Sequence, residues 1–265
     1  MRLNHRLTGL EQKADGALRL AFDGGATVEA DAVVAADGVN SVAQEVLFGA
    51  SAPNFTGRIA YRTVFSANRL NGLEVTNCTK WWGEDRHIVV YPVKPDRSEI
   101  YFVTSQPEPG FEIESWSAEG DVNVLRAAFE GFHPEVRKVV GAAPSVHKRP
   151  LVDREPLDRW VDGHVALLGD ACHPMTPYMA QGAAMAIEDA AILSRCLEGV
   201  NDRAGVGAAL ARYETTRKAR TSKMQLTSRQ NVWGKGATDT DWVYGYDALK
   251  VPLAQATELD AARAA

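Results

Sequence analysis

The order of apolar and polar positions divides the chain into regions of different expected structure. Residues 17–36 alternate, turn at "DGG" and end in the apolar run "DAVVAA", which predicts a hairpin and then a strand buried on both faces, as in a parallel sheet. Residues 57–105 contain runs rich in aromatic and β-branched residues, which predicts several strands of an antiparallel sheet. The run "HVALLGD" at 164–170 is again continuous and apolar, and indicates a second buried strand.

Two short helices are expected in the middle of the chain, within residues 121–141. Their apolar positions recur at helical spacing, and Asp121 is a suitable N-terminal cap for the first of them. Proline is favoured at the first turn of a helix and glycine just past its end. We therefore expect the second helix to begin at Pro134 and to end at Gly141.

Two longer helices are expected in the C-terminal part. One follows "HVALLGD" and ends near Leu197, and the other covers residues 204–232. Beyond them we expect a packed strap and an alanine-rich tail. The basic residues of the 204–232 helix indicate a solvated face, with an interaction surface as the alternative; they are Arg212, Arg217, Lys218, Arg220, Lys223 and Arg229.

This order of elements predicts an α/β fold with α+β character. An antiparallel-sheet domain is inserted into a partial, Rossmann-like nucleotide-binding domain, and helices follow at the C-terminus. The expected domains are residues 1–50, 51–150, 151–200 and 201–265.

Composition narrows the classes of function. The net charge of −5 gives no general attraction to nucleic acid or to acidic membranes, and no apolar run is long enough to span a bilayer. The N-terminus lacks the apolar core of a signal peptide, so a cytoplasmic location is expected. The three cysteines are widely spaced, which is typical of reduced thiols. No metal site is predicted, because metal-binding spacings are absent and the neighbours Cys172 and His173 are not expected to reach one ion.

The junction Gly169-Asp170 has the features of a ligand site. Ligands of open α/β sheets bind at the carboxyl ends of strands, and a helix start offers free N–H groups and a partial positive charge. The stretch "AQGAAMA" after it has almost no side-chain bulk, so a flat ligand can approach the backbone. The alternative is a well-capped turn in which Asp170 is only a structural acceptor.

A second junction, Asp37-Gly38, also follows an apolar run. Ser41 is placed to cap a helix that ends near Leu47. By itself this junction is an ordinary turn, but two Gly/Asp strand ends in one chain form a more specific pattern.

The stretches "DGVNSVAQ" and "GDACHPMTPYMAQGAAMAIEDA" resemble the second and third motifs of the FAD-dependent aromatic hydroxylases, the single-component flavoprotein monooxygenases. The resemblance extends over residues 2–253, and is strongest to the branches that act on 6-hydroxynicotinate and on salicylate. It implies FAD and NADH (or NADPH) as cofactors, with a small aromatic acid and O₂ as the other partners. A homodimer is also compatible with it.

The resemblance assigns roles to individual residues. Asp170 binds the ribityl chain of the flavin, the backbone from Ala180 to Gly182 faces the pyrimidine edge of its ring, and Pro177 lies near that ring. Asp37 and Gly38 belong to a motif shared by FAD and the pyridine nucleotide. The full set of expected FAD-binding residues is Asp37, Gly38, Gly169, Asp170, Pro177, Ala180, Gln181, Gly182 and Ala183.

The resemblance also implies a substrate pocket on the antiparallel sheet. There Cys78 and His87 hold the ring hydroxyl and carboxylate of the substrate and assist its deprotonation. The alternatives are a core thiol and a sheet histidine with structural partners. Tyr178 stands where the hydroxynicotinate branch often has histidine, and it keeps a hydroxyl that can take part in catalysis.

Besides Tyr178, two further departures from the family pattern qualify these expectations. Gln44 replaces the arginine of DGxxSxxR. The phosphate-binding GxGxxG is absent, since "GVGAAL" and "GKGATD" both lack the third glycine. We therefore expect a truncated product or a wrongly chosen start, which binds FAD poorly or not at all.

The function expected of the complete enzyme is hydroxylation, in some cases decarboxylative, of a hydroxylated aromatic or N-heteroaromatic carboxylic acid. Salicylate hydroxylation and a non-catalytic fragment unable to hold FAD are the alternatives.

Overall fold

The computed structural model describes residues 1–13, 16–50, 52–111, 118–232, 235–236 and 239–255. The chain forms two compact units. The first unit combines residues 1–54 with residues 153–265, and the second unit is the segment 55–152 between them.

The first unit contains two small sheets. One is antiparallel, with the strands β1 (Leu7–Gln12), β2 (Leu18–Phe22) and β3 (Thr27–Ala30) in that order and a short turn, η1 (Asp23–Gly25), between the last two. The hairpin of β2 and β3 confirms the prediction, whereas β1 was not predicted because its mostly exposed positions show no apolar alternation. The other sheet has the order β11-β12-β4, with the strands β4 (Val33–Ala35), β11 (Val161–Asp162) and β12 (Val165–Leu167).

The pairing of β12 with β4 joins the two predicted junctions. The strands run parallel, with Val33 opposite Val165 and Ala35 opposite Leu167, so their carboxyl ends lie at the same edge of the sheet. All of β12 is buried, as predicted. The prediction that the earlier strand is buried on both faces is wrong, because successive side chains point to opposite faces and Val34 is 43% exposed.

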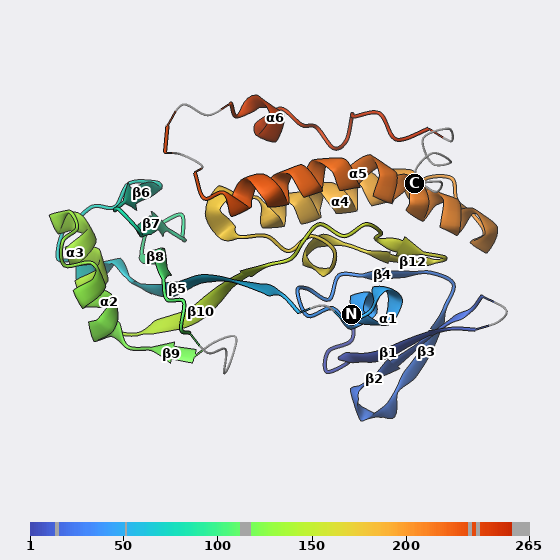
Figure 1. Cartoon of the computed structure of the whole chain (residues 1–265), viewed down its shortest axis with the longest axis horizontal. Helices are drawn as coiled ribbons and strands as arrows, with labels where there is room; N and C mark the ends of the chain where they lie inside the picture. The colour runs from blue at the N-terminus through green and yellow to red at the C-terminus, as the bar shows by residue number, and fades with distance from the viewer. Residues whose placement is uncertain (14–15, 51, 112–117, 233–234, 237–238, 256–265) are drawn as a thin grey trace. The chain divides into compact units, whose positions relative to one another are not determined.

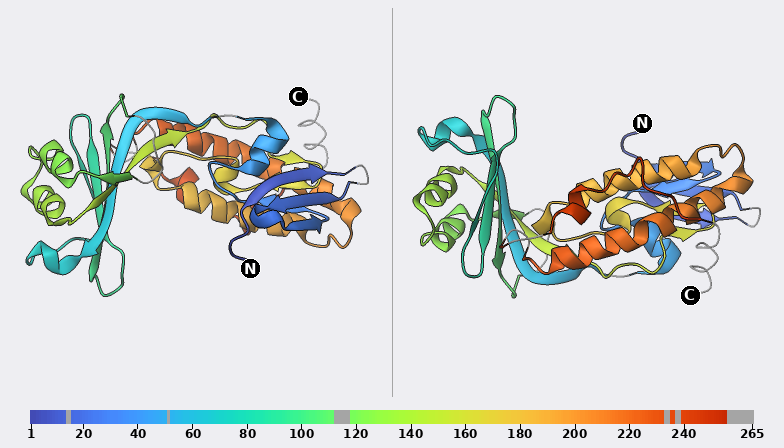
Figure 2. Two further views of the ribbon diagram at one scale, coloured as in Figure 1. Left: turned by 90° about the horizontal axis from the view of Figure 1, so that it is seen from below. Right: turned by 90° about the horizontal axis from the view of Figure 1, so that it is seen from above.

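The helices of the first unit are α1 (Val42–Phe48), α4 (Gly182–Leu197), α5 (Val206–Arg229) and α6 (Asp241–Tyr244), with the short turns η3 (Gly169–Ala171), η4 (Pro177–Met179) and η5 (Arg203–Gly205). The Ser41 hydroxyl accepts a hydrogen bond from the Gln44 N–H at 2.9 Å, which confirms the predicted cap of α1. The helices α4 and α5 lie side by side, as Figures 1 and 2 show. Their inner faces pack Ile192 and Tyr213 into one core with Leu167.

The charged surface expected of α5 is only partly present. Arg217 is fully buried, which contradicts the interpretation of all the basic residues as a solvated face. Two carboxylates of α4 compensate its charge, and the sequence pattern of α5 alone does not reveal them. The predicted strap is confirmed over its described part, where Arg195 donates to the carbonyls of Ala248 and Val251 at 2.7 and 2.8 Å.

The second unit is a six-stranded sheet with the order β6-β7-β8-β5-β10-β9. Its strands are β5 (Asn54–Ser66), β6 (Thr79–Trp82), β7 (His87–Pro92), β8 (Glu99–Pro107), β9 (Ala118–Gly120) and β10 (Val146–Asp153). The pairs β6-β7, β7-β8, β8-β5 and β10-β9 are antiparallel, and this confirms the prediction for residues 57–105. A short turn, η2 (Ala67–Leu70), follows β5.

Two helices, α2 (Val122–Ala128) and α3 (Pro134–Ala142), cover one face of this sheet (Figure 2). The Asp121 carboxylate accepts from the Asn123 N–H at 2.7 Å, so the predicted cap of the first helix is confirmed. The start at Pro134 is confirmed as well, and the helix ends one residue after Gly141. Phe129 packs from the helix layer against Phe102 and the other apolar residues of the sheet.

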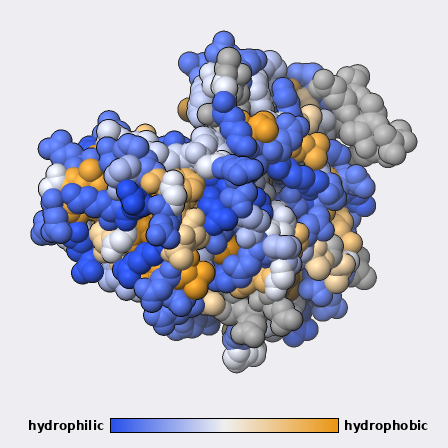
Figure 3. All heavy atoms as spheres, turned by 60° about the vertical axis from the view of Figure 1, so that its left-hand side comes forward, coloured by the Kyte–Doolittle hydropathy of each residue, from blue (hydrophilic) through white to orange (hydrophobic). Residues whose placement is uncertain are grey.

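The molecular face drawn in Figure 3 is mainly hydrophilic, with hydrophobic residues in small groups. Among the helices of the described residues, none combines the length and the apolar character needed to cross a bilayer.

Candidate functional site

A pocket of about 560 Å³ opens at the edge where β12 and β4 end. It is formed by η3, η4 and the first turns of α4, together with the residues that follow β4. Of the expected FAD-binding residues it contains Gly38, Gly169, Asp170, Pro177, Ala180, Gly182 and Ala183. The structure thus brings together residues from two junctions that are far apart in the sequence.

Asp170 is the ionisable residue of this pocket. It lies in η3 and is exposed, and no described residue holds its carboxylate by a hydrogen bond or ion pair. The other lining residues are apolar apart from Thr176, and most of them are small. The residues not yet named that complete the lining are Ala36, Leu168, Met175 and Ala186. A carboxylate with free acceptor sites above small residues is suited to bind the hydroxyl groups of a ligand.

Gly169 sets the direction of the turn that carries Asp170. Its backbone has a φ of +63°, in the left-handed region that glycine adopts without strain. A Cβ atom at this position would lie 3.1 Å from the Cβ of Ala186 in α4. Glycine therefore permits both the turn and the close packing of η3 against the helix.

The start of α4 supplies the second feature of the pocket. No side chain caps this helix, so its first N–H groups and the positive end of its dipole remain available at Gly182 and Ala183, which line the pocket. Ala180 just before it has a left-handed φ of +55°, which is unusual for a residue with a side chain. The geometry therefore favours a ligand group that carries or develops negative charge.

Among the predicted residues of the first unit, three lie outside the pocket lining. One carboxylate oxygen of Asp37 accepts from the N–H groups of Val42 and Ala43 at 2.9 and 3.3 Å, at the start of α1. Gln181 is buried at the start of α4, and Tyr178 is buried in η4. Gln44, which replaces the arginine of the family motif, is also buried.

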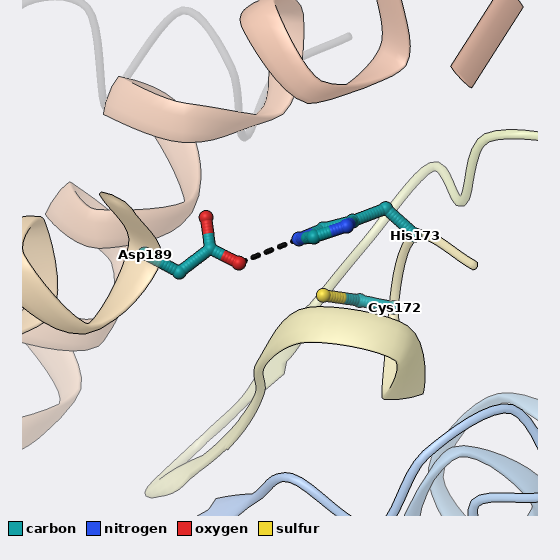
Figure 4. Close-up of side chains that lie close together, drawn as sticks. All are labelled: Cys172, His173 and Asp189. Atoms are coloured by element: carbon teal, nitrogen blue, oxygen red, sulfur yellow. Dashed lines mark hydrogen bonds and ion pairs between the residues drawn. The ribbon is translucent and has the colours of Figure 1, made fainter. Parts of the chain in front are cut away.

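A network of buried charges lies against η3. Figure 4 shows His173 directed at Asp189 of α4, with 2.5 Å between Nε2 of the histidine and Oδ2 of the carboxylate. The same oxygen accepts from the backbone N–H of Gly169 at 3.2 Å, and Oδ1 accepts from Nε of Arg217 at 2.8 Å. Asp189, His173 and Arg217 are all fully buried.

Glu188 of α4 extends this network. Glu188 accepts from Arg217 at 2.7 Å and from Arg220 at 2.8 Å, so two carboxylates face two guanidinium groups. Burial alone raises the pKa of Asp189, but the His173 hydrogen bond and the charges of His173 and Arg217 lower it further than burial raises it. Asp189 is therefore ionised at neutral pH.

The prediction that Cys172 and His173 cannot approach one ion is wrong. Their ligand atoms and those of Asp189 all lie within 4.8 Å of one another, because α4 brings the carboxylate to the turn (Figure 4). However, burial raises the pKa of the Cys172 thiol well above its ordinary value, whereas a metal ligand is a thiolate. Arg217 already neutralises Asp189. The donor set suits a hydrogen-bond network better than a cation.

The second unit carries the predicted substrate residues. Cys78 is exposed just before β6, and His87 is buried at the start of β7 with its ring 4.6 Å from that of Trp82 on the neighbouring strand. Ile88 and Val90 point into the core beneath α2 and α3. By strand alternation, His87 lies on the opposite, open face of the sheet.

Sequence reasoning did not single out the other polar residues of this open face. His87, Val89 and Tyr91 are alternate residues of β7 and therefore lie on the same face of the sheet. The ring of Tyr91 lies 5.0 Å from that of Tyr101 on β8. Burial, followed by the proximity of Tyr101 and Cys78, raises the pKa of Tyr91, and the nearby Arg62 opposes that rise. The alternation of β7 was the available signal, because it places His87 and Tyr91 on one face.

Comparison with known proteins identifies relatives of this arrangement. Residues 1–228 match the family described as FAD binding domain. The 6-hydroxynicotinate 3-monooxygenase of Bordetella bronchiseptica is 45% identical over 259 residues, with 96% of this chain and 66% of the relative covered. The protein of the same name from Pseudomonas fluorescens is 42% identical over 236 residues, with 88% and 61% covered. The chain thus spans less than two thirds of the length of either relative.

Solved structures share the fold. A salicylate hydroxylase substrate complex superposes with a TM-score of 0.80 at 25% identity, covering 97% of this chain and 70% of that chain. HpxO of Klebsiella pneumoniae, complexed with FAD and uric acid, superposes with a TM-score of 0.74 at 28% identity, covering 91% and 60%. The α/β fold with an antiparallel sheet, predicted from the order of elements, is confirmed.

Proposed function

The chain belongs to the FAD-binding-domain family of the aromatic hydroxylases, and from this membership we propose that it seats the flavin half of FAD and presents a sheet for an aromatic acid. The reaction proposed is hydroxylation of a hydroxylated aromatic or N-heteroaromatic carboxylate, in which FAD, NADH (or NADPH) and O₂ take part. The relatives named 6-hydroxynicotinate 3-monooxygenase support this substrate class.

The observation that carries the proposal is the pocket at the end of β12. Asp170 would offer carboxylate oxygens to the ribityl hydroxyls, and the uncapped start of α4 would face the pyrimidine edge of the ring. The lining residues Ala180, Gly182 and Ala183 have no bulky side chain, so a planar ring can lie against the backbone. The residues present therefore fit the flavin half of this cofactor.

The chain's own contribution to catalysis is to bind and to orient. FAD, when bound, would supply the redox chemistry that activates O₂ for the hydroxylation. The partial positive charge at the start of α4 stabilises negative charge on the ring. Gly38, which lines the pocket, and Asp37, at the start of α1, are proposed to form the motif shared by FAD and the pyridine nucleotide.

On the open face of the second unit's sheet, polar groups are proposed to hold the aromatic acid. His87 and Cys78 bind the ring hydroxyl and carboxylate and exchange a proton with them. Tyr91 keeps its phenolic proton at neutral pH, because the ordinary pKa of tyrosine is about 10 and burial raises the pKa of Tyr91 further, so it can donate a hydrogen bond to an anionic substrate. Tyr178 is proposed as a further catalytic residue on the basis of the family resemblance.

The three unpaired cysteines support a reducing, cytoplasmic compartment.

Riboflavin tests the proposed seat, because it contains the ring and the ribityl chain but no phosphate. Titration of riboflavin into the 265-residue chain, followed by flavin fluorescence, is expected to show saturable binding. The substitution Asp170→Asn is expected to weaken this binding about tenfold, which corresponds to about 1.4 kcal/mol. Asp158→Asn, at an exposed carboxylate of the same unit outside the pocket, is the matched control and is expected to bind as the unsubstituted chain does.

If the folded chain binds no riboflavin, or if the two variants bind equally well, the proposed seat is wrong. The first result would favour the alternative of a non-catalytic fragment. Titration with FAD is a further comparison, because no GxGxxG is present to bind its pyrophosphate. We therefore expect FAD to bind at most a few times more tightly than riboflavin.

Substrate preference is tested separately. Binding of 6-hydroxynicotinate and of salicylate is compared by isothermal titration calorimetry, with Cys78→Ala and His87→Ala as variants. Tighter binding of 6-hydroxynicotinate, lost in both variants, agrees with the proposal. Preference for salicylate favours the alternative substrate, and binding that both variants retain contradicts the assignment of Cys78 and His87.

A further inference from the structure

Asp189 accepts hydrogen bonds from three residues of the first unit. Its Oδ2 takes the Gly169 N–H at 3.2 Å and Nε2 of His173 at 2.5 Å, while its Oδ1 takes Nε of Arg217 at 2.8 Å. Gly169 is the first residue of η3, and His173 is the second residue beyond the end of η3. One carboxylate therefore holds both ends of the turn that contains Asp170.

We propose that Asp189, backed by Arg217, is the positioning residue that fixes the Asp170 turn for flavin binding. This inference rests on the proposed function, but neither Asp189 nor Arg217 lines the pocket. Asp189 acts through the backbone of Gly169 and the side chain of His173. Arg217 keeps Asp189 ionised and oriented, and Glu188 in turn holds Arg217 at 2.7 Å.

The contacts of α5 extend this positioning along the rest of the loop. Nε2 of Gln225 donates to the carbonyl of Pro174 at 3.1 Å, and the Ser228 hydroxyl donates to the carbonyl of Thr176 at 2.6 Å. Both side chains are buried. Side chains of α4 and α5 therefore hold the loop at Gly169, His173, Pro174 and Thr176, and Asp170 is the exposed residue within it.

Hydrogen exchange of the Gly169 amide reports on this contact without any cofactor. In the 265-residue chain, the Gly169 N–H is expected to be protected, because its acceptor is fully buried. The substitution Asp189→Asn is expected to increase its exchange rate at least tenfold and to weaken riboflavin binding at least fivefold. The charged acceptor is then replaced by an amide that cannot serve all three donors.

Glu188→Gln is the matched control. It removes one ion pair of the same Arg217 and an ion pair of Arg220, but it touches neither Gly169 nor His173. We expect it to lower the melting temperature while leaving Gly169 protected and the riboflavin affinity within twofold of the unsubstituted chain. Equal effects of Glu188→Gln and Asp189→Asn on both readouts would mean that the network only stabilises the fold.

A second variant covers the case in which Asp189→Asn does not fold. Asp189→Leu combined with Arg217→Met removes both buried charges together, a replacement that proteins often tolerate. We expect this variant to fold and to lose the protection of the Gly169 N–H. If it folds and keeps that protection, the inference is wrong, whatever its flavin binding. If Gly169 is released but the unsubstituted chain binds no riboflavin, only the proposed flavin seat fails.

Discussion

At the scale of single residues, backbone conformation at the end of β12 decides what the pocket can contain. Gly169 occupies the left-handed region with Ala186 close by, and Ala180 adopts the same region despite its side chain. Such conformations persist only where the surrounding structure imposes them, and they are often found at ligand sites. The Gly-Asp pair was recognisable in the sequence, whereas the unusual backbone of Ala180 was not, because alanine carries no turn signal.

The substitution Gly169→Ala is expected to lower the free energy of unfolding by about 1–3 kcal/mol, since alanine is strained at this φ and its Cβ crowds Ala186. Equilibrium unfolding in urea measures the change. Gly182→Ala is the control, because its Cβ would meet Met175 at 3.8 Å, an ordinary contact, and it lies in a helix. Its stability should be unchanged or raised by up to about 1 kcal/mol. Equal losses in both variants would contradict the argument from backbone strain.

At the scale of elements, α5 shows how a polar helix can be buried on one face. Its sequence predicts a solvated charge surface, but of its six basic residues only Lys223 is exposed. Arg217 is fully buried, since Asp189 and Glu188 of α4 surround it and the ring centre of Tyr246 in the strap lies 5.4 Å from its guanidinium carbon. Although burial lowers the pKa of Arg217, these carboxylates raise it overall. A pattern within one helix cannot reveal partners on another.

Arg217→Met is expected to lower the free energy of unfolding by about 3–5 kcal/mol at pH 7, because it leaves the Asp189 charge buried without its guanidinium. Arg159→Met, which breaks the exposed pair with Asp162, should cost about 0–1 kcal/mol. Urea unfolding of both variants measures the contrast. A loss for Arg217→Met as small as that for Arg159→Met would show that the buried pair contributes little.

The same pair predicts a pH dependence. The pKa of Asp189 in the folded chain lies below its ordinary value of 3.8, so its stabilisation is present above that pH and is lost as the pH falls through the folded-state pKa. The difference between Arg217→Met and the unsubstituted chain should therefore narrow as the pH is lowered below about 4.

At the scale of the whole molecule, each unit has its own main hydrophobic core among the described residues, and the first unit adds a smaller cluster around Met179, Met185 and Met224. One main core is centred on Trp160, Leu167 and Ile192 in the first unit, and the other on Phe102 and Phe129 in the second unit. The proposed flavin pocket belongs to the first unit and the proposed substrate face to the second. Each part of the proposed site therefore depends on its own core.

Phe129→Ala is expected to cost about 3–5 kcal/mol, because Phe129 is fully buried and the vacated space cannot close completely. Hydrogen exchange should increase mainly within residues 55–152. Ile192→Ala, at a fully buried residue of α4, is the matched variant and should act mainly on residues 1–54 and 153–265. Exchange that increases equally in both units for either variant would mean that the two cores unfold as one.

The sequence by itself determined the features that depend on near neighbours along the chain. The caps Ser41 and Asp121, the start of α3 at Pro134 and the strand-to-helix junction at Gly169-Asp170 all follow from local turn and capping chemistry. They were predicted because each hydrogen bond or φ constraint involves residues only a few positions apart.

Tertiary structure alone decided which polar groups leave water. The burial of Arg217, the meeting of His173 with Asp189 and the approach of Tyr91 to Tyr101 each join residues from different elements. A charged side chain in a sequence is expected in solvent by default, because burying it is unfavourable without a partner. Only the packing of α4 against α5, and of β7 against β8, supplies those partners.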